Sequence, residues 1–300
     1  MFGIPWYIFA LVAAVLVAAI SVMEKHELKK EHSLEYVVVL SVFNLAIAAF
    51  LWPWVKFQVP LVTLGWIYLA SILGALSLWF VAKALRHLDI SVVAPQTALN
   101  SVFAIIFAFV FLGEHITLIQ SLGIIVLMGG ALLLNRNVLH HSAFTHHGVL
   151  APKAKGKSSG LNFYQAILIA AMVFLGASSV IDKHILTTLD VPTFTFYIHI
   201  FLAFNHLLIY RIVVGGFKDL PKGISKAGWL IVVIAVATIL SRLAVAEALA
   251  MASVVLVIPI KRMSSVFATL VGGKMFQEKG LLLRLLVTLV MIAGVWMLVS

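Results

Sequence analysis

The chain has 300 residues, of which 63% are hydrophobic and only 11% charged, and its mean hydropathy is +1.14. Soluble domains carry roughly 25% charged residues, so this composition excludes a soluble globular protein and indicates a protein of the lipid bilayer. The absence of cysteine excludes disulfides and thiolate metal sites, while the formal charge of +10 must be interpreted from where the basic residues fall.

Apolar runs of about 20 residues, long enough to cross ~30 Å of hydrocarbon, recur along the whole chain. They predict ten transmembrane helices, at about 4–23, 35–55, 62–82, 90–112, 116–134, 162–181, 192–213, 227–249, 253–273 and 281–299. The first run lacks the positively charged start of a signal peptide and is interpreted as a span. The one long polar connection that this division leaves, residues 135–161, is too short for a soluble catalytic domain.

The first spans of the two halves end in related sequences. A shift of 158 residues places residues 21–28 on residues 179–186 with five of eight positions identical, and it matches Glu24 to the acid Asp182. Repeats of 20 to 50 residues mark solenoids, whereas this much longer period indicates a duplicated domain.

A second match covers the spans that contain proline. A shift of 164 residues places residues 82–104 on residues 246–268 with nine of 23 positions identical. Duplicated five-helix units are typical of secondary transporters, whose substrate site lies where the repeats meet. We therefore expect an all-α polytopic fold of two inverted repeats and a linker, with the divisions 1–134, 135–161 and 162–300.

The basic residues are distributed unevenly between the connections. Sixteen Lys and Arg lie in or beside the odd-numbered connections, and only Lys56 and Lys183 lie beside the even-numbered ones. Basic residues in short loops stay on the cytoplasmic side, so we expect a cytoplasmic linker and both termini outside, in the plasma membrane. The charge is thus a topology signal and not a patch for nucleic acid. Five spans per repeat is an odd number, so the second repeat is inverted relative to the first.

Several ionisable side chains fall inside predicted spans, where they normally face a partner or a watery cavity. Arg242 lies near the middle of the eighth span and Glu247 lies further along it, while Lys261 and Arg262 lie well inside the ninth. Lys83 closes the third span and is the repeat mate of Glu247. All four cations are candidate substrate ligands, and Glu247 is the candidate coupling group. The alternative is that they form packing ion pairs or extend to the interface.

Pro95 and Pro259 occupy matched positions and predict a kink or break in each span, because proline lacks the backbone donor. Broken helices at matched positions point to a transporter's substrate site, so both prolines are candidate hinges. Neutral hydrogen-bonding candidates lie nearby: Gln96, Asn100 and Ser264. One half thus offers neutral groups and the other two cations, which suits a substrate with a polar end and an anionic end. Helix–helix hydrogen bonding is the alternative for each neutral residue alone.

The remaining polar residues of the spans are interpreted as packing groups. His199, Asn205 and His206 fall in the seventh span and Asn44 in the second, where bonds to neighbouring helices are expected. Two histidine pairs in the linker lack the cysteine or acid that a zinc site needs, so no metal and no cofactor is expected.

The ten-span plan, the prolines of the fourth and ninth spans and the Leu112-Gly113-Glu114 turn resemble the EamA-type branch of the drug/metabolite transporter superfamily. This resemblance implies a secondary transporter with a central cavity lined by spans one, three, four, six, eight and nine. Relatives export amino acids and other small metabolites, and more distant ones carry nucleotide sugars or sugar phosphates. Lys261 and Arg262 resemble the Lys-Arg pair with which triose-phosphate translocators hold phosphate. Many relatives are described with cytosolic termini, opposite to the orientation that the charges predict here.

A transporter of a small organic anion, phosphorylated compound or amino acid is the leading hypothesis, with a proton as a candidate coupling partner. No P-loop is present, so ATP is not the direct energy source. The alternatives are a flippase for a lipid-linked phosphate, a non-transporting receptor, and an intramembrane enzyme. An enzyme is disfavoured because no HExxH or GxSxG motif occurs. The substrate identity, the direction of transport and the oligomeric state are left open.

Overall fold

The computed structural model describes residues 5–113, 117–126, 129–130, 133, 157–217, 220, 228–278 and 280–299. This part of the chain is helical and contains no strand. Its α-helices are α1 (Trp6–Leu28), α2 (Ser33–Ala48), α3 (Leu61–His87), α4 (Ile90–Gln96), α5 (Leu99–Leu112), α7 (Lys157–Leu186), α8 (Val191–Val214), α10 (Trp229–Met251), α11 (Val254–Lys261), α12 (Ser264–Phe267), α13 (Gly273–Met275) and α14 (Leu281–Val299). A 3-10 turn, η1 (Ala49–Trp54), extends α2, and a π-helical turn, η2 (Ala268–Gly272), joins α12 to α13.

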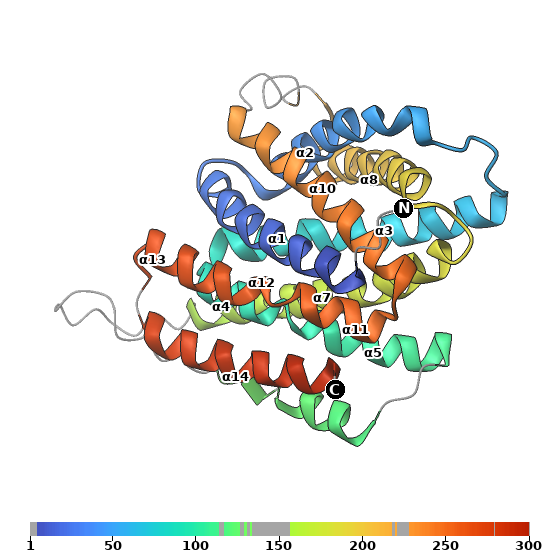
Figure 1. The fold of residues 1–300 in the computed structure, drawn as a ribbon. Coiled ribbons are helices and arrows are strands. Elements are labelled where there is room, and N and C mark those ends of the chain that lie inside the picture. The colour runs from blue at the N-terminus through green and yellow to red at the C-terminus, as the bar shows by residue number, and fades with distance from the viewer. Residues whose placement is uncertain are drawn as a thin grey trace.

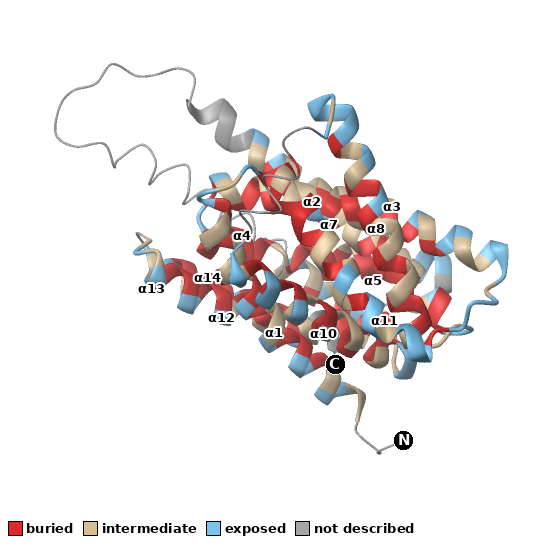
Figure 2. Cartoon of the chain, turned by 90° about the horizontal axis from the view of Figure 1, so that it is seen from above, coloured by how far each residue is buried: buried red, intermediate tan, exposed pale blue. Residues whose placement is uncertain are grey.

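Helices from the two halves of the chain pack against each other in one bundle (Figure 1). The most extensive contacts are those of α3 with α7, α1 with α10, α5 with α7 and α2 with α8. Gly176 of α7 allows one close approach, because a Cβ there would lie 2.7 Å from the Cβ of Phe103 in α5. Buried residues gather on the facing sides of these helices and exposed ones lie on the outside (Figure 2). The interior is therefore shared between the halves.

The two spans that contain proline are interrupted just after it. Pro95 lies in α4, and the helix ends at Gln96 before α5 begins at Leu99. Pro259 lies in α11, which ends at Lys261 before α12 begins at Ser264. The ninth span is then interrupted again by η2, a π-helical turn of the kind that recurs at functional sites.

Matched lysines make the same contact in both halves. Lys25 Nζ of α1 donates to the carbonyls of Leu85 and Leu88, each at 2.6 Å, where α3 ends. Lys183 Nζ of α7 donates to the carbonyls of Leu249 at 2.7 Å and Ala252 at 2.9 Å, where α10 ends. The acceptors correspond under the shift of 164 residues that aligns the proline spans. The same lysine–carbonyl contact is therefore made at the carboxyl ends of α3 and α10.

Seven helices of the described residues are long and apolar enough to cross a membrane: Trp6–Leu28, Ser33–Trp54, Leu61–His87, Ile90–Phe111, Phe163–Leu186, Val191–Val214 and Trp229–Met251. The predicted ninth span is missing from this set because it is divided into short helices, and the tenth qualifies only as a shorter apolar helix, Leu281–Met297. The predicted fifth span and the linker 135–161 lie partly outside the described residues, so the count of ten stays a prediction.

Candidate functional site

A cavity of about 240 Å³ lies between the two halves of the bundle. Its walls come from α1, α2, α3 and α4 of the first half, and from α7, α8, α10, α11 and α12 of the second. These include the six spans that the resemblance implied, and they add α2 and α8. The polar groups of the lining are Ser21, Glu24, Ser41, Asn44, Ser77, Thr97, Ser178, His199, His206, Thr238, Ser241, Arg242, Lys261, Arg262, Ser264 and Ser265.

One cation of the lining, Arg242, is already neutralised. Its Nη2 atom lies 3.0 Å from Oδ2 of the buried Asp182. The guanidinium also lies 5.1 Å from the ring centroid of Phe194. Because both its charge and its flat face are engaged by protein groups, Arg242 contributes shape and hydrogen bonds to the cavity more than net charge.

The other two cations form no close ion pair with the described residues, although the carboxylate of Asp182 acts electrostatically on Lys261. In the part of the chain that the structure describes, neither Lys261 nor Arg262 takes part in an ion pair. Arg262 is 5% exposed, and its Nε and Nη2 atoms are buried without a hydrogen-bond partner among those residues. A buried charged donor without an acceptor is costly, so Arg262 keeps donors at the cavity that no described protein group satisfies.

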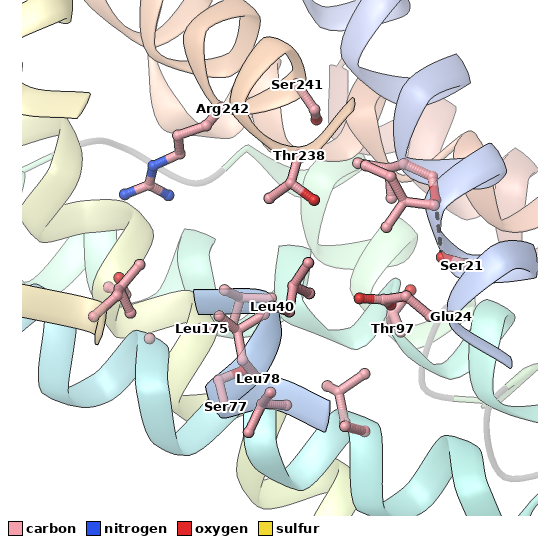
Figure 3. Close-up of a pocket in the computed structure, with 18 of the residues that line it drawn as sticks. Ser21, Glu24, Leu40, Ser77, Leu78, Thr97, Leu175, Thr238, Ser241 and Arg242 are labelled. Carbon is pink, nitrogen blue, oxygen red and sulfur yellow. Dashed lines mark hydrogen bonds between the residues drawn. The ribbon is translucent and has the colours of Figure 1, made fainter. Parts of the chain in front are cut away.

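Glu24 is the acid of the cavity lining. It is partly buried near the end of α1 and accepts a hydrogen bond from the Tyr36 hydroxyl at 3.3 Å. Figure 3 shows Glu24 beside Thr97 and across the cavity from Arg242. The site thus has a positive corner formed by Lys261 and Arg262, and a carboxylate elsewhere on its wall.

Histidines complete the polar lining, and their neighbours fix which ring nitrogen carries the proton. His206 Nε2 lies 3.1 Å from the Ala75 carbonyl and must donate to it, which leaves Nδ1 as an acceptor in the neutral ring. The Ser41 hydroxyl lies 2.5 Å from this Nδ1 and 2.6 Å from the Val37 carbonyl, and its one proton can be donated to either acceptor. His199 Nδ1 lies 2.8 Å from the Thr195 carbonyl and donates there, so Nε2 is left as an acceptor. The expected bonds to neighbouring helices are confirmed for His206, but both rings also line the cavity.

The structure brings together some of the predicted site residues and not others. Lys261, Arg262, Arg242 and Ser264 line the cavity. Gln96 and Asn100 are buried close to the break after Pro95, but they are not part of the lining.

Two predicted residues lie away from the cavity. Lys83 Nζ is placed over the rings of Trp79 at 5.7 Å and Phe163 at 5.5 Å, and Glu247 is partly buried elsewhere on α10. Because α1 and α7 extend beyond the predicted ends of their spans, two acids absent from the predicted set, Glu24 and Asp182, lie inside long membrane helices. The sequence did single out Glu24 and Asp182 in one respect, because the repeat matches one acid to the other.

The cavity extends unequally toward the two ends of the bundle. In the first half, α1 lines it as far as Glu24 and α3 as far as Ala82, both near their carboxyl ends. In the second half the corresponding stretches do not line it: α7 stops at Ser178 and α10 at Arg242. The carboxyl ends of α1 and α3 lead into the odd-numbered connections, so the cavity reaches further toward that side.

No group of three or more His, Asp or Glu able to hold a metal occurs among the described residues.

Residues 4–136 match the model of the EamA-like transporter family. No curated protein sequence matches the chain. A crystal structure of another protein aligns with a TM-score of 0.60 over 97% of this chain and 95% of that one at 14% sequence identity, which shows a shared fold. Seven apolar helices of membrane-spanning length indicate an integral membrane protein, and its first half is similar to a transporter family.

Proposed function

We propose that the protein is a secondary transporter that moves a small metabolite with an anionic group through the central cavity. The observation that carries this proposal is the buried Arg262, whose Nε and Nη2 atoms have no partner among the described residues, beside Lys261 on the wall of the same cavity. Organic anions, phosphorylated compounds and amino acids all carry a group that fits this corner. The guanidinium of Arg262 suits a carboxylate or phosphate because it offers a rigid fork of donors.

Alternating access by two inverted repeats is the mechanism that we propose. It is supported by the helix breaks after Pro95 and Pro259 and by the matched contacts of Lys25 and Lys183. In this mechanism one half rocks against the other around a fixed midplane site. A cavity with walls from both halves is what such a movement needs.

The first experiment is a thermal-shift screen of the purified protein against phosphorylated sugars, carboxylates and amino acids. A ligand that binds only the folded state raises the apparent stability with its saturation. The dissociation constant of the best ligand is then measured for Lys261→Ala, Arg262→Ala and Arg262→Lys. A charge-assisted hydrogen bond contributes about 1.5–3 kcal/mol, so each variant should bind roughly tenfold to a hundredfold more weakly.

Lys274→Ala is the matched control, because Lys274 is an exposed cation of α13 that does not line the cavity. It should bind the ligand as the wild type does. Uptake of the same compound into proteoliposomes tests transport itself. Wild-type affinity in all three cavity variants would remove the anion site from the proposal.

A further inference from the structure

The matched acids of the two repeats are compensated differently. Asp182 forms the ion pair with Arg242 and is buried. Glu24, its mate, forms no ion pair in the described part of the chain, and its hydrogen bond is with the Tyr36 hydroxyl. The shift of 164 residues places Leu78 at the position of Arg242, so the first repeat has a leucine where the second has the neutralising cation. Leu78 also lines the cavity.

The charged residues near Glu24 on α1 make contacts with groups other than Glu24. Lys25 of the same helix donates to the carbonyls at the end of α3. Glu27, one turn on, lies 3.5 Å from Lys30. Neither residue therefore supplies Glu24 with a counterion.

The helices packed against α1 do not supply one either. No charged side chain occurs on α4, α12 or η2. The cation of α10, Arg242, is paired with Asp182 of α7. None of the other titratable groups on the packed helices forms an ion pair with Glu24 in the described structure. These groups are Glu35 and Tyr36 on α2, Lys83, Arg86 and His87 on α3, Glu247 on α10, Lys261 on α11, and Arg262 after it. In the described structure Glu24 is therefore a carboxylate within a membrane helix without a cation.

We propose that Glu24 takes up a proton when an anion binds at Lys261 and Arg262, so that the proton and the anion cross the membrane together. An ionised carboxylate in such a place is costly, and its negative charge also repels an anion entering the same cavity. Protonation of one carboxylate oxygen, by water on the side to which the cavity is open, removes both costs. The proton is returned to water when the cavity opens to the other side, and no bond of the substrate changes.

This inference rests on the proposed transport function, and it assigns the coupling role to Glu24 in place of Glu247. Thermodynamic linkage makes the effect reciprocal: if protonation strengthens anion binding, anion binding strengthens protonation by the same factor. Couplings between two sites of one protein are typically about 5- to 150-fold in affinity. The binding of an anion should then strengthen on acidification by a factor in that range.

The test uses the purified full-length protein with inorganic sulfate as the probe, because sulfate keeps its charge across the neutral range. Sulfate binding is measured calorimetrically between about pH 5 and pH 8, a range in which ordinary carboxyls stay largely ionised. We expect the wild type to bind at least about fivefold more tightly at the acidic end. Glu24→Gln should bind tightly at every pH, because the amide mimics the protonated acid. Glu27→Gln, on the same helix but outside the cavity, should behave as the wild type.

Infrared difference spectra test the protonation of Glu24 without any anion. Acidification should produce a protonated-carboxyl band in the wild type and in Glu27→Gln, and Glu24→Gln should lack it. If Glu24→Gln does not fold, Leu78→Arg is the second variant, because the arginine would give Glu24 the ion pair that its mate has. The band and the pH dependence should then disappear together.

The proposal is overturned if Glu24→Gln keeps the wild-type pH dependence, which would place the titrating group on Lys261, His199 or His206. It is also overturned if sulfate binding depends on sodium and not on pH. A failed anion site gives a different pattern: sulfate binding unaffected by Lys261→Ala and Arg262→Ala, with the infrared band of Glu24 still present. The two proposals therefore fail separately.

Discussion

Arg242, Lys261 and Arg262 line one cavity, yet their surroundings assign them different tasks. Arg242 is held between the buried Asp182 and the Phe194 ring, and removing Arg242 would leave the Asp182 carboxylate buried without its ion pair. Lys261 and Arg262 have no such partner among the described residues. The proposed anion site therefore rests on the second pair, while Arg242 joins α10 to α7 through Asp182 and to α8 through Phe194.

Only part of this arrangement follows from the sequence. Cations inside the span after Pro259 are visible as departures from an apolar pattern, so Lys261 and Arg262 could be predicted. Glu24 and Asp182 were missed because each follows the last apolar residue of its predicted span, whereas the helices continue to Leu28 and Leu186. The ion pair itself depends on which faces of α7 and α10 meet, and no local pattern encodes that.

Asp190 gives a prediction on pH at the even-numbered connection between α7 and α8. Its partial burial acts to raise the pKa, but hydrogen bonds from Thr193 and the Lys56 ammonium, 3.0 Å away, outweigh burial and hold the pKa below its usual value. A carboxyl with a lowered folded-state pKa stabilises the fold above its unfolded pKa, and this contribution is lost as the pH falls through the folded value. The apparent Tm of the wild type should exceed that of Asp190→Asn near pH 7, and the gap should shrink below about pH 4. A gap that stays constant down to pH 3 would show that the Asp190 pair does not stabilise the fold.

At the scale of elements, the breaks in the two proline spans have the same cause and lie at matched positions of the repeats. Proline removes a hydrogen bond in α4 and α11, and each helix stops within two residues of it. These breaks were predictable from Pro95 and Pro259. The π-helical turn η2 was not predictable. The matching segment of the first repeat lies in α5, which is a regular α-helix although the residues just before the two segments are closely related. Gly272 packs so closely against Ile90 of the first half that a Cβ would not fit, whereas its repeat mate is Ala108.

The lysine contacts at the ends of α3 and α10 give a prediction on stability. Each ammonium satisfies two carbonyls where a helix stops before a break, and hydrogen bonds to charged groups contribute about 1.5–3 kcal/mol. Lys25→Met and Lys183→Met should therefore each lower the apparent Tm of the purified protein by several degrees. Lys30→Met, which removes an exposed lysine of the same region, should have little effect. If only one of the two variants is destabilised, the lysine contact contributes to stability in only one of the two halves.

At the scale of the whole molecule, the cavity and the polar contacts at the two ends describe one conformation. The lining reaches toward the odd-numbered connections along α1 and α3 and stops short on α7 and α10. At the opposite end Lys56 pairs with Asp190, and Lys183 bonds the end of α10. On the odd-numbered side the halves are joined by Arg284, which contacts Asp89 and Glu278, and Glu278 accepts from the backbone N–H groups at the start of α4. An alternating-access cycle would have to break the contacts of one end while keeping those of the other.

The distribution of basic residues makes a prediction on the side to which this cavity reaches. Basic loops stay in the cytoplasm, so the odd-numbered connections should be cytoplasmic and the cavity should extend inward. The chain has no cysteine, so a single introduced thiol reports its own position. Gln58 lies exposed between α2 and α3, and Lys30 lies exposed between α1 and α2, at opposite ends of α2. On intact cells an impermeant maleimide should label Gln58→Cys and leave Lys30→Cys unlabelled until the membrane is opened. The reverse pattern would turn the molecule over and make the cavity reach outward, while the fold and the two repeats would remain as described.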